Sequence, residues 1–396
     1  NKVVYEAEFR PQYLRVVSTT SFIDKKIYEP GLWYNSIAKA EPLTLGTTNA
    51  VALHSNSFKL IVKGYRRLYN VNIEAVILDG LASRRFNYIP EIYMMFEWHG
   101  NPIGVVMSYL KGVDGSYPFY SALKEFLKGN NIAYRLGLAG LLGWEIAELH
   151  KTLSSIDTPL FKPEEISIND LERWCKRIEK YHAEALNALD KLMGLTKYKW
   201  IEYYRDIADK HLSILVEKAI DLLKAYNGLK KIRIHQDLHL SQLIYVENRG
   251  FYFIDFEGEP ARSDEERLEK DPCLRDLATI IRSFQYLSFS TLMEIKGIKH
   301  PHKLADKVIK NGDPSFSWRR RHISSILASY LSGIARLSTM ILGLEPTLLI
   351  PSAPKLLTPW VIEKGLYELY YEALYRPDNV PIPLTGLLEM KTFLKV

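Results

Sequence analysis

The sequence predicts an α+β protein with two lobes, of which the first is rich in strands and the second is mostly helical. In the first 110 residues, short apolar runs alternate with turn residues, whereas after residue 111 apolar residues recur at helical spacing. A single predicted hairpin interrupts the helical part. The 396 residues are enough for two or three domains. With 47% hydrophobic and 25% charged residues, the chain is neither disordered nor fibrous.

The N-terminal lobe is predicted from its turns and apolar runs. We expect strands over residues 51–53, 58–63, 93–98 and 103–107. Asn72 can cap a helix that begins at Ile73 and ends near Arg84. We assign residues 43–110 to a nucleotide-binding lobe and residues 1–42 to a cap subdomain on it.

The C-terminal lobe, residues 111–396, is predicted to contain helices and the hairpin. One helix ends near His150, and residues 166–226 have the pattern of two or three amphipathic helices. Three apolar runs predict strands over 231–234, 242–246 and 251–254, with the last two closing a hairpin. From Asp264 onward the pattern is helical again.

Composition excludes several classes of protein. The formal net charge of +6 is mild and the basic runs are short, so we expect no nucleic-acid partner. The most apolar stretch, 323–344, contains Arg336 and has helical spacing, which predicts a buried helix and no membrane partner. Two cysteines cannot form a disulfide framework, which favours a cytoplasmic location. Few glutamines and many charges suggest a thermophilic source.

The densest polar cluster is His235-Gln236-Asp237-Leu238-His239-Leu240-Ser241-Gln242, and Asp255-Phe256-Glu257 follows the next strands. A hairpin brings its ends together, so we expect Asp237, Gln242, Asp255 and Glu257 to converge. Phosphoryl transfer needs a carboxylate near the attacking hydroxyl and oxygen ligands for Mg²⁺. Asp237 is the candidate base, and Gln242 and Asp255 are candidate metal ligands. The alternative is a solvated loop beside a strand end.

These motifs resemble those of a known family. His-x-Asp-x-x-x-x-Gln followed by Asp-Phe-Glu-Gly-Glu-Pro is similar to the maltokinases, in the aminoglycoside-phosphotransferase branch of protein-kinase-like folds. Leu274-Arg275-Asp276 and the segment from Glu363 to Pro377 are similar as well. The similarity runs from about Gly46 to Gly386. It implies a bilobal protein-kinase-like fold, ATP as phosphoryl donor and Mg²⁺ as cofactor.

In the N-terminal lobe the resemblance implies a nucleotide site. Lys63-Gly-Tyr-Arg-Arg-Leu matches the family pattern, which places Lys63 at the nucleotide phosphates and Glu74 as its ion-pair partner. Without the resemblance, a surface salt bridge would be the better interpretation of this pair. Further nucleotide contacts are expected from the turn residues Thr47 and Thr48, where an ordinary β-turn is equally compatible, and from the interlobe hinge residues Met107 and Tyr109.

In the C-terminal lobe the resemblance narrows the roles of the polar cluster. Gln242 replaces the Asn of protein kinases, and Glu257, at the position of a glycine, adds an oxygen for a second Mg²⁺. Asp276 is expected to accept hydrogen bonds from the backbone of the catalytic loop. His235 is expected to brace that loop, and His239 to pack beneath it and contact the acceptor. Alternatively, the two imidazoles could ligate zinc.

The helix from Glu363 is a candidate acceptor site. Lys364, Tyr367, Glu368 and Tyr371 recur at helical spacing, and aromatic rings with charged groups are suited to binding a sugar. Arg282 is a further candidate for acceptor contact. The alternative for this helix is a plain amphipathic one with buried tyrosines and solvated charges.

The predicted function is therefore an ATP-dependent sugar kinase that converts maltose and ATP to maltose 1-phosphate and ADP. We expect a monomer, with an oligomer as the open alternative. A kinase of another sugar, such as glucosamine, is the alternative of the same class. Two alternatives belong to other classes: a metal-dependent hydrolase built on His235, Asp237 and His239, and an inactive kinase-like binding protein. Intact Asp237, Gln242, Asp255 and Lys63 disfavour the inactive protein.

Overall fold

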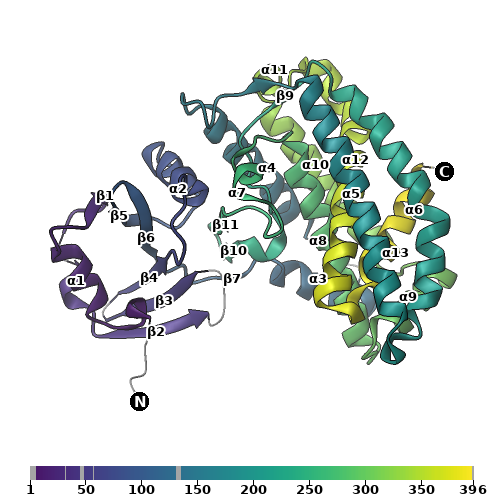
Figure 1. Ribbon diagram of the computed structural model, residues 1–396, viewed down its shortest axis with the longest axis horizontal. Coiled ribbons are helices and arrows are strands. Elements are labelled where there is room, and N and C mark those ends of the chain that lie inside the picture. The colour runs from purple at the N-terminus through teal and green to yellow at the C-terminus, as the bar shows by residue number, and fades with distance from the viewer. Residues whose placement is uncertain (1–5, 32, 45–48, 57, 131–134, 395–396) are drawn as a thin grey trace. The chain divides into compact units, whose positions relative to one another are not determined.

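The computed structural model describes residues 6–394 apart from 32, 45–48, 57 and 131–134 (Figure 1). The chain forms two compact units. The first contains residues 1–113 and 244–269, and the second contains residues 114–243 and 270–396. The hairpin segment 244–269 therefore belongs to the N-terminal unit, whereas the sequence pattern predicts it in the helical lobe.

A six-stranded antiparallel sheet forms the centre of the first unit, in the order β1-β5-β6-β4-β3-β2. Its strands are β1 (Asp24–Ile27), β2 (Lys39–Thr44), β3 (Ala50–Ser55), β4 (Lys59–Gly64), β5 (Ile92–Trp98) and β6 (Asn101–Ser108). The four inner strands confirm the runs predicted from the sequence. The two edge strands come from residues 24–27 and 39–44, so part of the segment predicted as a cap, residues 1–42, contributes strands to the sheet.

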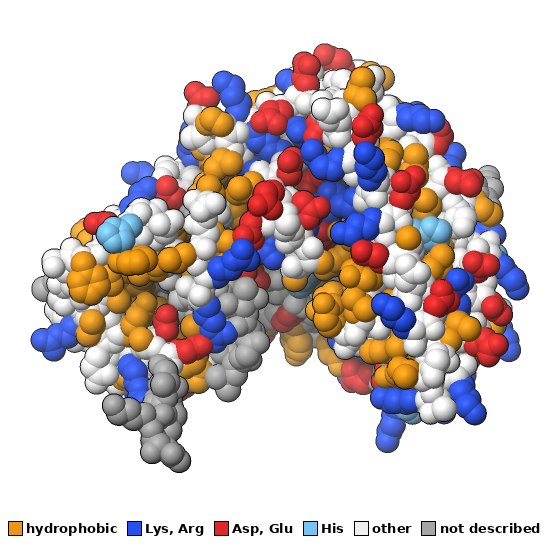
Figure 2. Space-filling view, viewed as in Figure 1, with side chains coloured by type: hydrophobic (Ala, Val, Ile, Leu, Met, Phe, Trp, Pro, Cys, Tyr) orange, Lys and Arg blue, Asp and Glu red, His pale blue; other side chains and the backbone are white. Residues whose placement is uncertain are grey.

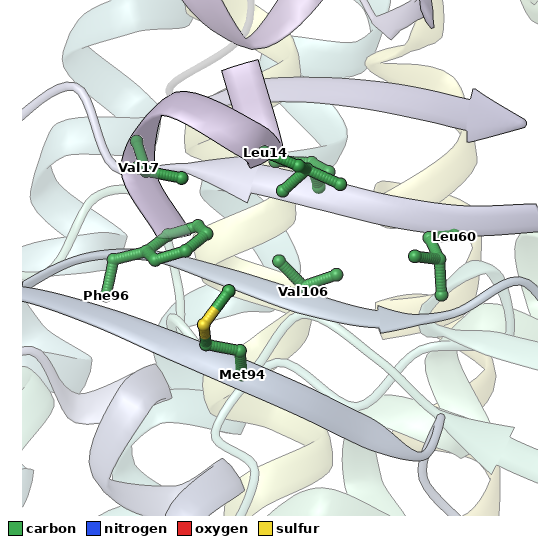
Figure 3. Packing of buried hydrophobic residues seen from close by; sticks show 7 residues of the cluster. Leu14, Val17, Leu60, Met94, Phe96 and Val106 are labelled. Carbon is green, nitrogen blue, oxygen red and sulfur yellow. The ribbon is translucent and has the colours of Figure 1, made fainter. Parts of the chain in front are cut away.

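The core of the first unit lies between the sheet and helix α1 (Tyr13–Thr19). Leu14 and Val17 point from α1 toward the strands, where they meet alternate residues of β4, β5 and β6 (Figure 3). The strand residues in this cluster are Leu60, Val62, Met94, Phe96 and Val106. Since alternate residues share one face of a strand, this packing leaves the opposite face of β4 for Lys63.

Helix α2 (Ile73–Ser83) begins where the sequence predicted it. The Asn72 side chain accepts a hydrogen bond from the backbone N–H of Ala75 at 3.1 Å, which satisfies one of the free donors of the first turn. Glu74 lies in that first turn.

The predicted hairpin is confirmed as β10 (Leu243–Val246) and β11 (Gly250–Phe253), which form a three-stranded sheet with β7 (Val113–Asp114). The predicted strand over 231–234 is wrong beyond its first residue, because β9 contains only Lys230 and Lys231 and pairs with β8 (Glu164–Glu165). Past Ile232, which forms a single bridge to Asp271, the backbone donates to a side chain instead of a neighbouring strand.

The second unit is helical. Its longer helices are α3 (Tyr117–Leu127), α4 (Leu136–Ser154), α5 (Ile168–Met193), α6 (Ile201–Leu223), α8 (Leu274–Ile295), α9 (Pro301–Asn311), α10 (Phe316–Ile334), α12 (Pro346–Tyr375) and α13 (Pro381–Leu394). Helix α12 packs against α5, α6, α8 and α13, and α4 packs along α10 (Figure 1). Charges of both signs are interspersed over the face of this unit seen in Figure 2.

The predicted helix in the apolar stretch 323–344 is α10, which ends at Ile334 and is followed by the short helix α11 (Ser338–Ile341). Across the part of the chain that the structure describes, every helix taken singly is too short or too polar to cross a membrane. The bent pair 316–341 and 346–375 passes that test of length and composition only when its two parts are taken together.

Candidate active site

Lys63 lies at the centre of an acidic cluster in the first unit. Its ammonium nitrogen is 2.8 Å from Glu74 Oε2, 2.8 Å from Asp255 Oδ1 and 2.6 Å from Glu257 Oε1. Lys63 is 7% exposed and Glu74 2%. Three carboxylates from two distant parts of the sequence therefore share one buried ammonium.

The local backbone sets up this cluster. Lys63 is opposite Val51 of β3 and Val105 of β6, and both of these strand pairs have a continuous register. Asp255 follows β11 and has a φ of +64°, a conformation that costs a non-glycine residue about 1–2 kcal/mol. The buried ring of Phe256 anchors the turn. Such strain at a polar turn is typical of functional sites.

The charges in the cluster shift one another's protonation. Burial raises the pKa of Glu74 to about 7, with Asp255 and Glu257 adding to the rise and Lys63 opposing it. Burial alone would lower the pKa of the Lys63 ammonium, but Glu74, Asp255 and Glu257 raise it well above its ordinary value. The lysine is therefore a permanent cation in this cluster.

The same cluster can hold a divalent cation. Oxygen atoms of Glu74, Asp255 and Glu257 lie within 4.8 Å of one another. Carboxylate oxygens are the ligands that Mg²⁺ prefers. Among the described residues this is the one group of three or more acidic, histidine or cysteine side chains so arranged, so His235, Asp237 and His239 do not form the zinc site of the hydrolase alternative.

Two of the four other residues that are predicted to contact the nucleotide lie among the described residues, at the end of β6. Met107 is buried near the end of β6, and Tyr109 follows that strand, 38% exposed with the Lys59 ammonium 5.1 Å from its ring centre. Thr47 and Thr48 lie outside the described residues. Asn49, which follows them in the sequence, donates its side-chain amide to Glu257.

Asp237 is the centre of a second polar cluster, in the second unit. The Lys364 ammonium of α12 donates to Asp237 Oδ1 at 3.0 Å, and His239 Nε2 lies 3.8 Å from Oδ2. Asp237 is 9% exposed and Lys364 6%. Lys364 Nζ also lies 4.7 Å from the ring centre of Tyr367. The structure thus brings together four residues from two of the predicted motifs.

The loop before Asp237 is fixed from helix α8. The Asp276 carboxylate accepts the backbone N–H groups of His235 at 2.8 Å and Gln236 at 3.0 Å. His150 of α4 lies 3.0 Å from the same carboxylate. Gln236 itself has a φ of +73°. Gln236, the residue before Asp237, is thus strained, and its own hydrogen bond and that of His235 to the Asp276 carboxylate hold the loop.

Sequence reasoning missed a buried ion network next to this loop. Glu363 of α12, 1% exposed, accepts from Arg177 Nε of α5 at 2.5 Å and from Arg275 Nε of α8 at 3.1 Å. Asp271 lies 3.8 Å from Arg177 and 3.6 Å from Arg275. Glu363 and Arg275 directly precede Lys364 and Asp276, two predicted site residues. This position in the sequence is the feature from which the network could have been predicted.

The remaining residues predicted to contact the acceptor pair with or pack against other protein groups. Arg282 is 2% exposed, with its guanidinium 2.7 Å from Glu368 and 3.3 Å from the carbonyl of Pro383. Tyr367 is 6% exposed and packs on Tyr181, with ring centres 5.4 Å apart. Since these groups are buried against protein, they offer little surface to a ligand in this state.

Tyr371 and the exposed Tyr375 continue the column of rings outward from Tyr367 along α12. Gln242, half-buried at the end of a short 3₁₀ turn, belongs to the second unit, and Asp255 to the first. The convergence of Gln242 and Asp237 with Asp255 and Glu257 therefore stays a prediction.

No known protein-family profile matches the chain. Among solved structures, the chain is similar to glucosamine kinase in complex with glucosamine, ADP and inorganic phosphate, with 17% identity and a TM-score of 0.70 over 96% of this chain and 82% of that one. The chain is also similar to glucosamine kinase in its crystal form B, with 18% identity and a TM-score of 0.70 over 96% of this chain and 83% of that one. At this identity the likeness concerns the fold, and it confirms the predicted kinase-like α+β fold.

Proposed function

We propose that the protein is an ATP-dependent phosphotransferase that acts on a sugar hydroxyl. The observation that carries the proposal is the Lys63 ammonium, paired with Glu74 on a helix and with Asp255 at a strand end. In kinases a strand lysine paired with a helix glutamate holds the nucleotide phosphates, and an aspartate after a strand holds Mg²⁺. A surface salt bridge would not bury Lys63 and Glu74. The likeness to a sugar kinase fold gives further support.

The first unit would hold the nucleotide. Lys63 would neutralise the phosphates, and Met107 and Tyr109 would lie against the adenine. Mg²⁺ would be held by Asp255 and Glu257, with Gln242 as a further proposed ligand, and would neutralise charge on the transferring phosphoryl group. The ammonium would then exchange carboxylate partners for phosphate oxygens.

The second unit would hold the acceptor. Asp237 would accept the proton of the attacking sugar hydroxyl while the oxygen of that hydroxyl bonds to the γ-phosphorus of ATP. The bond between the γ-phosphorus and the β–γ bridging oxygen would break, which releases ADP. Lys364 fixes one carboxylate oxygen of Asp237 at 3.0 Å, which leaves the other to take the proton.

Two acceptors are proposed. Maltose, phosphorylated at its anomeric hydroxyl, is favoured by the resemblance of residues 235–284 and 363–377 to maltokinases. Glucosamine is favoured by the structural likeness to glucosamine kinase over almost the whole chain. In either case the proposed residues for acceptor contact are His239, Lys364, Tyr367, Glu368, Tyr371 and Arg282.

The test is a panel of sugars that includes maltose and glucosamine, incubated with Mg-ATP and followed by ADP release. ³¹P NMR of the product then identifies the hydroxyl that received the phosphoryl group. Asp237→Asn should lower kcat by about 10²–10⁴-fold while ATP binding stays intact, since the amide cannot take the proton. Asp157→Asn, at a carboxylate that is 85% exposed, is the matched control. Sugar-independent ADP release, or full turnover by Asp237→Asn, would contradict the proposal.

A further inference from the structure

The buried network around Glu363 contains four charges that the proposed reaction does not use. Arg177, Arg275, Asp271 and Glu363 are between 1% and 8% exposed, and their charges balance. Burying four charged groups is expensive, and well-packed apolar residues often serve stability better. A network of this kind is therefore better explained by the geometry that it fixes than by the stability that it adds.

The network touches the loop of Asp237 through Arg275. Arg275 Nη1 donates to the backbone carbonyl of Gln236 at 3.4 Å, a long but charge-assisted contact. Gln236 is the strained residue with φ of +73°, directly before Asp237. The Asp276 carboxylate accepts the backbone N–H of the same residue. Two consecutive residues of α8 therefore bind the backbone N–H and the backbone carbonyl of Gln236.

Glu363 gives the network its link to the acceptor helix. Its carboxylate holds the Arg275 guanidinium at 3.1 Å, and the next residue, Lys364, binds Asp237. Helix α12 thus reaches Asp237 by two routes: directly through Lys364, and indirectly through Glu363, Arg275 and the carbonyl of Gln236. A shift of α12 relative to α8 would move both.

We infer that Arg275 is a positioning residue, which uses its ion pair with Glu363 to hold the strained backbone at Gln236 and so to aim the Asp237 carboxylate. The role of Asp237 as catalytic base rests on the proposed function. The contact by which Arg275 stabilises the loop does not depend on that function.

The chain offers a matched control in Arg177. Its contacts among the described residues are with Glu363 and Asp271, the same two carboxylates that Arg275 meets, and it is similarly buried. It makes no contact with Gln236 in that set. Arg177→Met and Arg275→Met therefore remove equivalent charges from the network, but only Arg275→Met releases the loop.

Two measurements on the full-length variants test the inference. Hydrogen–deuterium exchange of the peptide that covers residues 235–237 should be about tenfold faster in Arg275→Met than in Arg177→Met, at similar melting temperatures. With an accepted sugar, kcat should fall about 100-fold in Arg275→Met while KM for ATP is unchanged, and should stay close to wild type in Arg177→Met. Should Arg275→Met fail to fold, Arg275→Lys keeps the charge and should still show fast exchange, because one ammonium cannot span Glu363 and the Gln236 carbonyl.

Equal exchange of this peptide in the Arg275 and Arg177 variants would overturn the inference, and so would equal losses of kcat that follow the loss of stability. If the wild-type protein phosphorylates no sugar, the proposed function fails, and the exchange measurement still decides whether Arg275 positions the loop.

Discussion

Replacing Lys63 by methionine removes an ammonium that is shared by three carboxylates. Its ammonium lies 2.6–2.8 Å from Glu74, Asp255 and Glu257, whose oxygens come within 4.8 Å of one another. Loss of one partner from a buried ion pair costs about 3–5 kcal/mol. For a unit of this size each kcal/mol lowers Tm by about 2–4 °C, so we expect a decrease of about 6–20 °C at pH 7.5 without metal.

The assay is thermal unfolding followed by circular dichroism, at pH 7.5 and pH 5.5. The decrease in Tm of Lys63→Met relative to the wild type should be smaller at pH 5.5, because a carboxyl that takes up a proton no longer repels its neighbours. MgCl₂ should raise Tm of the variant more than that of the wild type, since the cation can replace the lost ammonium. Lys59→Met, at an exposed lysine of the same strand, is the control. The reasoning fails if both variants unfold at the same temperature at pH 7.5, or if the decrease in Tm does not depend on pH.

Three further outcomes are expected. Asp255→Asn, which tolerates the φ of +64°, should weaken Mg-ATP binding about tenfold in calorimetry and leave metal-free ATP binding unchanged; equal affinity would remove Asp255 from the metal site. Tyr367→Leu should raise KM for the sugar and not for ATP, because Lys364 loses the ring 4.7 Å from its nitrogen, whereas exposed Tyr375→Leu should change neither. Since the pKa of Glu74 is raised to about 7, the folded state binds more protons than the unfolded state above pH 4.5, and the free energy of unfolding should fall by up to about 3 kcal/mol as the pH rises to 7. Denaturant titrations of Glu74→Gln should lack that decrease.

Strongly patterned elements were predictable from the sequence. The inner strands of the sheet are apolar runs bounded by turn residues. Asn72 gives α2 a start that local chemistry specifies. The edge strands were not predictable, because β1 has the charged sequence Asp-Lys-Lys-Ile and β2 contains Pro42. Both features are usual where a strand has a partner on one side only, and they weaken any strand signal.

Helix α12 and its network show a different limit. The helix begins at Pro346, well before the predicted start at Glu363, and contains Pro351, Pro354 and Pro359. Local rules predict a break at such residues. The helix nevertheless continues through all three, although only Pro359 is buried and Pro351 and Pro354 are exposed. The pairing of Glu363 with two arginines depends on how three helices pack, which residue spacing within any one of them does not encode.

The hairpin segment 244–269 has a consequence for synthesis of the chain. Lys63 and Asp255 are 192 residues apart, and all of residues 114–243 lie between the two parts of the first unit. At about 5–20 residues per second, a ribosome needs about 10–40 s after it has made Lys63 to supply the partner carboxylates. During that interval the nascent sheet carries an ammonium with Glu74 as its only acidic partner from the cluster. A fragment that stops at residue 113 would stay in that state permanently, so an autonomous version of the unit requires residues 244–269 to be joined to it.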